Sequence, residues 1–194
     1  LQPAEGEAVG VAPGFVIYDD DDQLNLIKQA LVELSLAPKQ YSPRLIQASI
    51  SATKSRLLSE QTQSHGVDSY FEEIVQRVHE RYQSLLGQSD AVDFDDILLK
   101  TVRLFQSRPD ILAKYQERYI HVLVDEFQDT NLAQFEMVKL LAARHNNLCV
   151  VGDPDQSIYS WRSADVRNIL SFESEYPDAR VVFLDQNYRS SKTI

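Results

Sequence analysis

The stretch Ile120-His121-Val122-Leu123-Val124-Asp125-Glu126 decides the fold. Its apolar, largely β-branched run predicts a short buried strand, and two acidic residues follow where that strand would end. Similar short runs occur at 148–151 and 181–184, and the segments between the runs, at 132–141 and around 164–175, have helical spacing. Because strands that alternate with helices build βαβ units, the sequence predicts an α/β fold with a parallel sheet.

Upstream of this region the pattern is helical. Apolar residues recur at helical spacing at 24–34 and, most clearly, at 71–85, where Gly87 is expected to stop the helix. The dipeptide Ser42-Pro43 is a cap and first-turn signal for another helix, which is expected to continue to about residue 58.

A fourth helix is expected after Asp93, whose side chain can cap it, and before Pro109, which interrupts it. The apolar residues expected to face inward on this helix are Phe94, Leu98, Val102 and Phe105.

We place a domain boundary near residue 90. Residues 15–90 are expected to form an all-helical subdomain and residues 91–194 part of an α/β domain. The segment 1–14 is rich in glycine and proline and is expected to be a loose segment or linker.

The composition narrows the class of protein. Of 194 residues, 43% are apolar and 25% are charged, which excludes wholesale disorder. No apolar run approaches the roughly 20 residues that span a bilayer. The formal net charge of −10 argues against unspecific polyanion binding, although Lys39, Arg44, Lys54 and Arg56 leave a local basic face open.

The single cysteine, Cys149, lies in an apolar run and is expected to be a buried, inert thiol. No disulfide can form within the chain, which fits an intracellular protein. The four histidines show no metal-ligand spacing, so a zinc site is not expected. The N-terminus has neither an initiator methionine nor a signal pattern, and we expect the chain to be a piece of a longer protein.

Polar residues follow all three expected strands, and ligands of open parallel sheets bind beyond the carboxyl ends of strands. Asp125 can hold Mg²⁺ and Glu126 can deprotonate a water, or both can be a solvated strand end. After the second strand, Gln156 is suited to contact a phosphate or a water. The third is followed by Tyr188 and Arg189, an aromatic residue and a cation that can reach a phosphate.

The segment after Gln156 holds a second type of candidate. Tyr159, Trp161 and Arg162 can fill a core, or they can form a stacking platform for nucleobases with a cation beside it.

Together these segments resemble a known family. Val-Asp-Glu-Phe-Gln-Asp-Thr-Asn at 124–131, Val-Gly-Asp-Pro-Asp-Gln-Ser-Ile-Tyr-Ser-Trp-Arg at 151–162 and Leu-Asp-Gln-Asn-Tyr-Arg-Ser at 184–190 resemble motifs II, III and IV of superfamily 1 DNA helicases of the UvrD/Rep/PcrA type. Segments 18–28 and 93–98 are also similar to that family.

Two features depart from the family pattern. Ser163 stands where the family commonly has glycine. The chain also contains no Gly-x-x-x-x-Gly-Lys phosphate loop. The family's motif I is therefore expected upstream of residue 1, and the second motor domain, with motifs V and VI, downstream of residue 194.

The resemblance implies a partial RecA-like P-loop NTPase motor domain, in which 91–194 would be the later half of the first motor domain (1A-like) and 15–90 its helical insert (1B-like). It implies a cytoplasmic, ATP-dependent helicase that moves 3′ to 5′ on single-stranded DNA and uses ATP and Mg²⁺. The expected partners are single-stranded DNA and single-strand/duplex junctions, and no membrane partner is expected. The implied roles are Mg²⁺ binding by Asp125 with Glu126, activation of water by Glu126, γ-phosphate sensing by Gln156, adenine stacking by Tyr188, an arginine finger at Arg189, base stacking by Tyr159 and Trp161, and a phosphate or cation–π contact by Arg162.

Two alternatives remain open at this stage. One is the motor portion of a helicase–nuclease of the RecB/AddA type. The other is a non-catalytic module that contacts DNA or a partner protein. In either case the isolated chain is expected to lack ATPase activity, because it lacks the phosphate loop.

Overall fold

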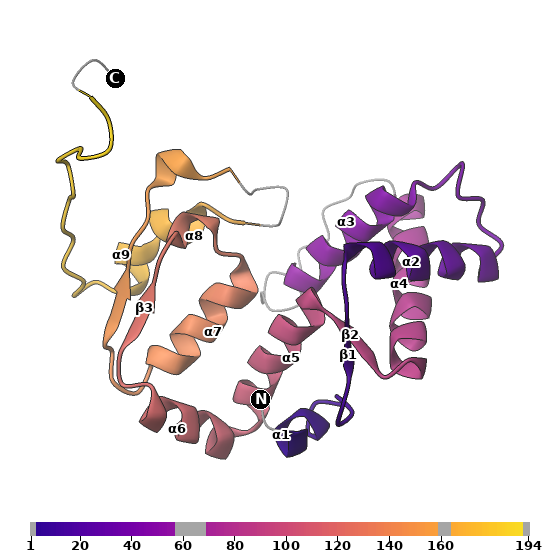
Figure 1. Ribbon diagram of the computed structural model, residues 1–194, viewed down its shortest axis with the longest axis horizontal. Coiled ribbons are helices and arrows are strands. Elements are labelled where there is room, and N and C mark those ends of the chain that lie inside the picture. The colour runs from indigo at the N-terminus through magenta and orange to yellow at the C-terminus, as the bar shows by residue number, and fades with distance from the viewer. Residues whose placement is uncertain (1–2, 57–68, 159–163, 192–194) are drawn as a thin grey trace.

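A computed structural model of the chain describes residues 3–56, 69–158 and 164–191. Figure 1 shows two groups of elements, a helical group and a mixed group of helices and strands, with α5 between them. In chain order the elements are α1 (Pro3–Glu7), β1 (Val16–Tyr18), α2 (Asp20–Glu33), α3 (Pro43–Arg56), α4 (Ser69–Gln88), β2 (Ala91–Asp93), α5 (Phe94–Ser107), α6 (Pro109–Arg118), β3 (Val122–Val124), η1 (Phe127–Asp129), α7 (Leu132–Ala142), β4 (Leu148–Val150), η2 (Pro154–Gln156), α8 (Arg167–Leu170) and α9 (Phe172–Glu175).

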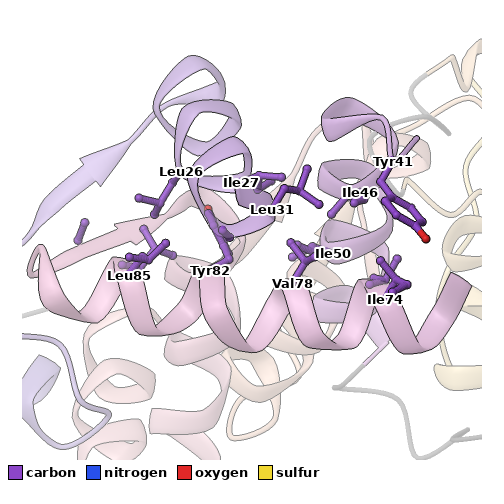
Figure 2. Close-up of a cluster of buried hydrophobic side chains, with 14 residues drawn as sticks. Leu26, Ile27, Leu31, Tyr41, Ile46, Ile50, Ile74, Val78, Tyr82 and Leu85 are labelled. Carbon is purple, nitrogen blue, oxygen red and sulfur yellow. The ribbon is translucent and has the colours of Figure 1, made fainter. Parts of the chain in front are cut away.

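The helical group packs α2, α3 and α4 around one apolar core, as the periodicity predicts (Figure 2). Helix α2 begins with a capping box, in which the Asp19 side chain accepts backbone N–H groups of the first turn and Asp22 bonds back to Asp19. Its inward residues Ile27 and Leu31 meet Val78 and Tyr82 of α4, which places the core along the whole length of α4.

Two short strands that the sequence did not predict close this group. β1 pairs in parallel with β2, with Ile17 opposite Val92, and Ala91 packs into the core of the helical group. The expected stop at Gly87 is wrong by a residue, since α4 continues to Gln88. The chain reverses instead at Asp90, which has a φ of +47° and takes the left-handed conformation that glycine usually provides after a helix.

Helix α5 is capped by Asp93, as expected: its carboxylate accepts the N–H of Asp96 at 2.7 Å. The expected inward face is wrong at its first position, because Phe94 is 55% exposed, while Val102 and Phe105 are buried. In the first turn the inward positions belong to Asp93 and Asp96, which are nearly inaccessible to solvent.

A buried cation explains this arrangement. Lys54 of α3 is 2% exposed and forms ion pairs with Asp93 and, at 2.9 Å, with Asp96. The hydroxyl of Tyr82 donates to Asp93 at 2.7 Å, and burial raises the pKa of that tyrosine. Lys54 therefore fastens α3 to the start of α5 and is not part of a basic surface.

The segment 1–14 is not loose throughout, contrary to expectation. It contains α1, and the buried Glu5 accepts hydrogen bonds from Lys114 and Tyr115 of α6, both at 2.8 Å. The ammonium of Lys100 in α5 donates to the carbonyl of Val9 at 3.1 Å.

In the mixed group, the first two of the three expected strands and the helix between them are present. β3 pairs in parallel with β4, and α7 connects them. The expected strand at 181–184 is wrong: this segment has no ladder partner among the described residues, Phe183 and Leu184 are each 84% exposed, and the chain leaves as an irregular tail (Figure 1). The expected helix around 164–175 is divided into α8 and α9.

The expected burial of Cys149 is also wrong. Cys149 is opposite Leu123 in the ladder, and both side chains are exposed, Leu123 by 76%. Side chains alternate between the two faces of a sheet, so the exposure of Leu123 and Cys149 shows that the face they share is uncovered in the described residues. Among the helices that the structure describes, none has the length and hydropathy of a membrane span.

Candidate functional site

Strand β3 delivers two exposed carboxylates to the carboxyl edge of its sheet. Asp125 follows the strand directly and accepts the backbone N–H of Glu126 at 2.9 Å. Glu126 has a φ of +51°, in the left-handed region that side chains other than glycine rarely adopt. Such conformations cost free energy and occur at functional sites; Ser35, Asp90 and Asn146 share this conformation, so it marks Glu126 only together with the carboxylates beside it.

The loop after β4 lies beside this turn because the ladder continues past both strands. The N–H of Val151 donates to the carbonyl of Val124 at 2.8 Å, and the N–H of Phe127 donates back to Val151 at 2.9 Å. The residues that follow β4 are therefore held against those that follow β3, at the same edge of the sheet.

Asp153 shapes the second loop. Its carboxylate caps η2 by accepting the N–H of Asp155 at 3.0 Å, and it also accepts the side-chain amide of Gln156 at 2.7 Å. Gln156 itself is exposed, which leaves its amide accessible to a ligand.

Gln128 joins the two loops. It is 1% exposed; its amide nitrogen donates to the Glu126 carboxylate at 2.8 Å, and its amide oxygen accepts the N–H of Asp153 at 3.0 Å. A continuous hydrogen-bonded chain therefore runs from Glu126 through Gln128 and Asp153 to Gln156.

The turn that carries Gln128 is anchored by aromatic packing. Phe127 is fully buried and contacts Phe135 of α7 and Phe172 of α9 edge to face, at centroid separations of 5.4 and 5.6 Å. Helix α7 in turn begins with a capping box between Asn131 and Gln134. The turn between β3 and α7 is thus fixed on both sides.

A second clasp joins this turn to α8. Asn168 is buried and donates to the carbonyl and hydroxyl oxygens of Thr130, at 3.0 and 3.2 Å. Beside it the Arg167 guanidinium, which bonds to Asp165, holds the pKa of that carboxyl below its usual value. Asp153 and Asn168 are therefore each attached to the turn after β3.

The donor set at the sheet edge fits Mg²⁺. Asp125 and Glu126 offer accessible carboxylate oxygens. Asp129, three residues after Glu126, has a buried carboxylate oxygen to which no group of the described residues donates a hydrogen bond. Among the described residues, no group of three or more His, Cys, Asp or Glu side chains is arranged to hold a metal. One or two carboxylates are the usual protein contribution where substrate phosphates and water complete the shell.

The remaining expected site residues are not joined to this edge. Tyr188 is 91% exposed and Arg189 is exposed; the backbone N–H of Arg189 donates to the Asn187 side chain in a local turn. Within the described residues, no hydrogen bond or ion pair links these side chains to Asp125, Glu126 or Gln156. Tyr159, Trp161 and Arg162 lie outside the described residues, so their predicted contacts with DNA stay predictions.

Comparison with known proteins identifies the family and the relatives of this chain. Residues 3–177 match the UvrD/REP helicase N-terminal domain. The chain belongs to this family. The curated relatives include the ATP-dependent DNA helicases PcrA of Leuconostoc citreum (48% identical over 190 residues), Bacillus subtilis (46% over 188) and Staphylococcus aureus (44% over 190).

These alignments cover 97–98% of the chain but only 25–26% of each relative. The UvrD/REP-type chain thus spans about a quarter of the length of the curated relatives it matches. The family resemblance drawn from residues 124–131, 151–162 and 184–190 is confirmed.

The sequence did not identify three buried residues that tie neighbouring segments together at this edge of the sheet. Gln128, Thr130 and Asn168 had no predicted role, although Gln128 lies within the motif that resembles motif II. Gly152 was a usable signal, because a glycine directly after a strand indicates that another group approaches the backbone closely.

Proposed function

We propose that this chain is the part of an ATP-dependent DNA helicase that contains the water-activating and phosphate-sensing residues. The observation that carries the proposal is the hydrogen-bonded chain from Glu126 through Gln128 and Asp153 to Gln156 at one sheet edge. The printed names of the relatives, which are ATP-dependent DNA helicases, support the same function.

The chemistry follows from the groups at that edge. Asp125, with Glu126 beside it, holds Mg²⁺, which when bound neutralises charge on the β- and γ-phosphates. Glu126 orients the attacking water and accepts its proton. The exposed amide of Gln156 contacts the γ-phosphate. Loss of that phosphate therefore removes a contact of the segment that precedes residues 159–162 in the chain.

Further residues complete the proposed cycle. Arg189 stabilises charge on the transferred phosphoryl group and Tyr188 stacks on adenine, which requires the exposed tail to approach the site. Tyr159 and Trp161 stack on bases of single-stranded DNA, with Arg162 on a phosphate. The domain division is part of the proposal: 15–90 is the 1B-like insert and 91–194 belongs to a RecA-like domain, whose remaining elements cover the face of Leu123 and Cys149.

The test uses the full-length protein. We expect ATP hydrolysis that requires Mg²⁺ and increases with single-stranded DNA, together with ATP-driven separation of a duplex that has a 3′ tail. A duplex with a 5′ tail is the matched control and should stay paired. Absence of DNA-stimulated hydrolysis by the folded full-length protein would contradict the proposal.

A further inference from the structure

We propose that Gln128 is a positioning residue that holds the Glu126 carboxylate and the Asp153 backbone in one fixed relation, so that the water-activating turn and the phosphate-sensing loop move as a unit. The inference rests on the proposed function, because Glu126 and Gln156 have their chemical roles only there. It assigns Gln128 a role in the reaction beyond its contribution to folding.

The orientation of the Gln128 amide follows from its partners. A backbone N–H can only donate, so the Asp153 N–H fixes the oxygen end of the amide, and a carboxylate accepts, so Glu126 takes the nitrogen end. A flipped amide would lose both hydrogen bonds. Because Gln128 is 1% exposed, water competes poorly for either bond.

The Glu126 carboxylate depends on this contact. In the part of the chain that the structure describes, no other hydrogen bond reaches that carboxylate, whose other surroundings are open to solvent. A base on an exposed side chain would sample many rotamers, whereas a general base must be held within hydrogen-bond reach of the proton that it removes. Gln128 provides that restraint from a buried, packed turn.

Gly152 shows how closely the second loop fits around Gln128. A Cβ at position 152 would lie 2.6 Å from the Gln128 amide oxygen and 2.9 Å from Ile169 Cδ1, both well inside normal contact distance. The Ser157 hydroxyl also approaches the Gln128 carbonyl, at 3.4 Å. The loop after β4 therefore contacts Gln128 closely at several points, and a shift of Gln128 would move this loop.

Two substitutions separate the ends of this bridge in the full-length protein. Gln128→Met keeps the side-chain length and removes the hydrogen bonds to Glu126 and Asp153, together with a longer one, of 3.4 Å, that the amide nitrogen donates to Asp129. Gln128→Glu keeps an acceptor for the Asp153 N–H but replaces the donor to Glu126 with a second carboxylate. Asn168→Ala is the matched control, because it removes the buried clasp between the same turn and α8 without touching Glu126 or Asp153.

The measurements are kcat and KM for ATP at saturating single-stranded DNA, the affinity for a fluorescent ATP analogue, and the melting temperature. Because general-base catalysis contributes about 10²–10⁴-fold, we expect both Gln128 variants to lose roughly tenfold or more in kcat with KM and nucleotide affinity changed less than about threefold. Asn168→Ala is expected to lower the melting temperature comparably while kcat stays within about twofold.

Equal losses of kcat in Gln128→Met and Asn168→Ala would overturn the inference, since Gln128 would then be only structural. Wild-type kcat in both Gln128 variants would also overturn it. If Gln128→Met does not fold, Gln128→Glu carries the same test. Glu126→Gln is measured in parallel: if it abolishes hydrolysis while the Gln128 variants behave like Asn168→Ala, only this inference fails; if it hydrolyses ATP normally, the proposed role of Glu126 fails and the inference with it.

Discussion

Replacing Lys54 with methionine is expected to destabilise the junction of α3 and α5 strongly. The side chains of Lys54, Asp93 and Asp96 are only 2–5% exposed, so the substitution leaves two carboxylates buried without their cation. Removing one partner of a buried ion pair costs about 3–5 kcal/mol, far more than the apolar contacts that methionine can supply.

Hydrogen–deuterium exchange of the full-length protein measures this locally. A loss of about 3–5 kcal/mol corresponds, at about 1.4 kcal/mol per decade, to exchange roughly 150- to 5,000-fold faster for the amides in α3 and α5 that exchange through local unfolding. Lys114→Met is the control, because the Lys114 side chain is 53% exposed and its ion pair with Glu5 contributes at most about 1 kcal/mol.

A second variant tests the reason for the loss. Adding Asp93→Asn to Lys54→Met removes one uncompensated charge and keeps an acceptor for the N-cap of α5, so it is expected to recover part of the protection. If Lys54→Met exchanges no faster than Lys114→Met, the buried cluster does not fasten α3 to α5 and the explanation for the outward Phe94 is wrong.

Two further predictions concern single positions. Gly152→Ala is expected to destabilise the fold by about 1–3 kcal/mol and to lower ATP hydrolysis, because its Cβ would displace Gln128. Gly87→Ala in α4 is the control: its Cβ would meet nothing within 4 Å, so the variant is expected to be neutral or slightly stabilising. Melting and ATPase assays of both variants check this, and a neutral Gly152→Ala would contradict the close approach. Burial raises the pKa of Asp95, so ionising this side chain lowers the stability of the fold, and that loss of stability develops as pH rises through the folded-state pKa. Asp95→Asn is therefore expected to raise the melting temperature at about pH 7 and to lose that advantage near about pH 3.5. An equal effect on the melting temperature at both pH values would refute this prediction.

The elements that local pattern specifies could be predicted from the sequence. The 71–85 periodicity predicts α4, the Asp93 cap predicts the start of α5, and the apolar runs that precede Asp125 and Gly152 predict β3 and β4. In each case the signal and the structure that it specifies lie within the same few residues.

The features that depend on distant partners were missed. Phe94 turns outward because Lys54, 39 residues before Asp93, occupies the inward side of the first turn of α5. Gln128 owes its importance to Asp153, 25 residues later, and β1 exists as a strand only because β2 pairs with it. The segment 181–184 has strand composition but no described strand beside it, so composition alone was misleading there.

The function assigned to the sheet edge is tested most directly by Glu126→Gln in the full-length protein. The substitution keeps the size of the side chain and its hydrogen-bonding capacity but removes the group that accepts the proton of water. We expect DNA-stimulated ATP hydrolysis to fall by about 10²–10⁴-fold while the affinity for ATP is retained within a few-fold. Hydrolysis near the wild-type rate by a variant that still binds ATP and DNA would contradict the assignment of Glu126 as the base.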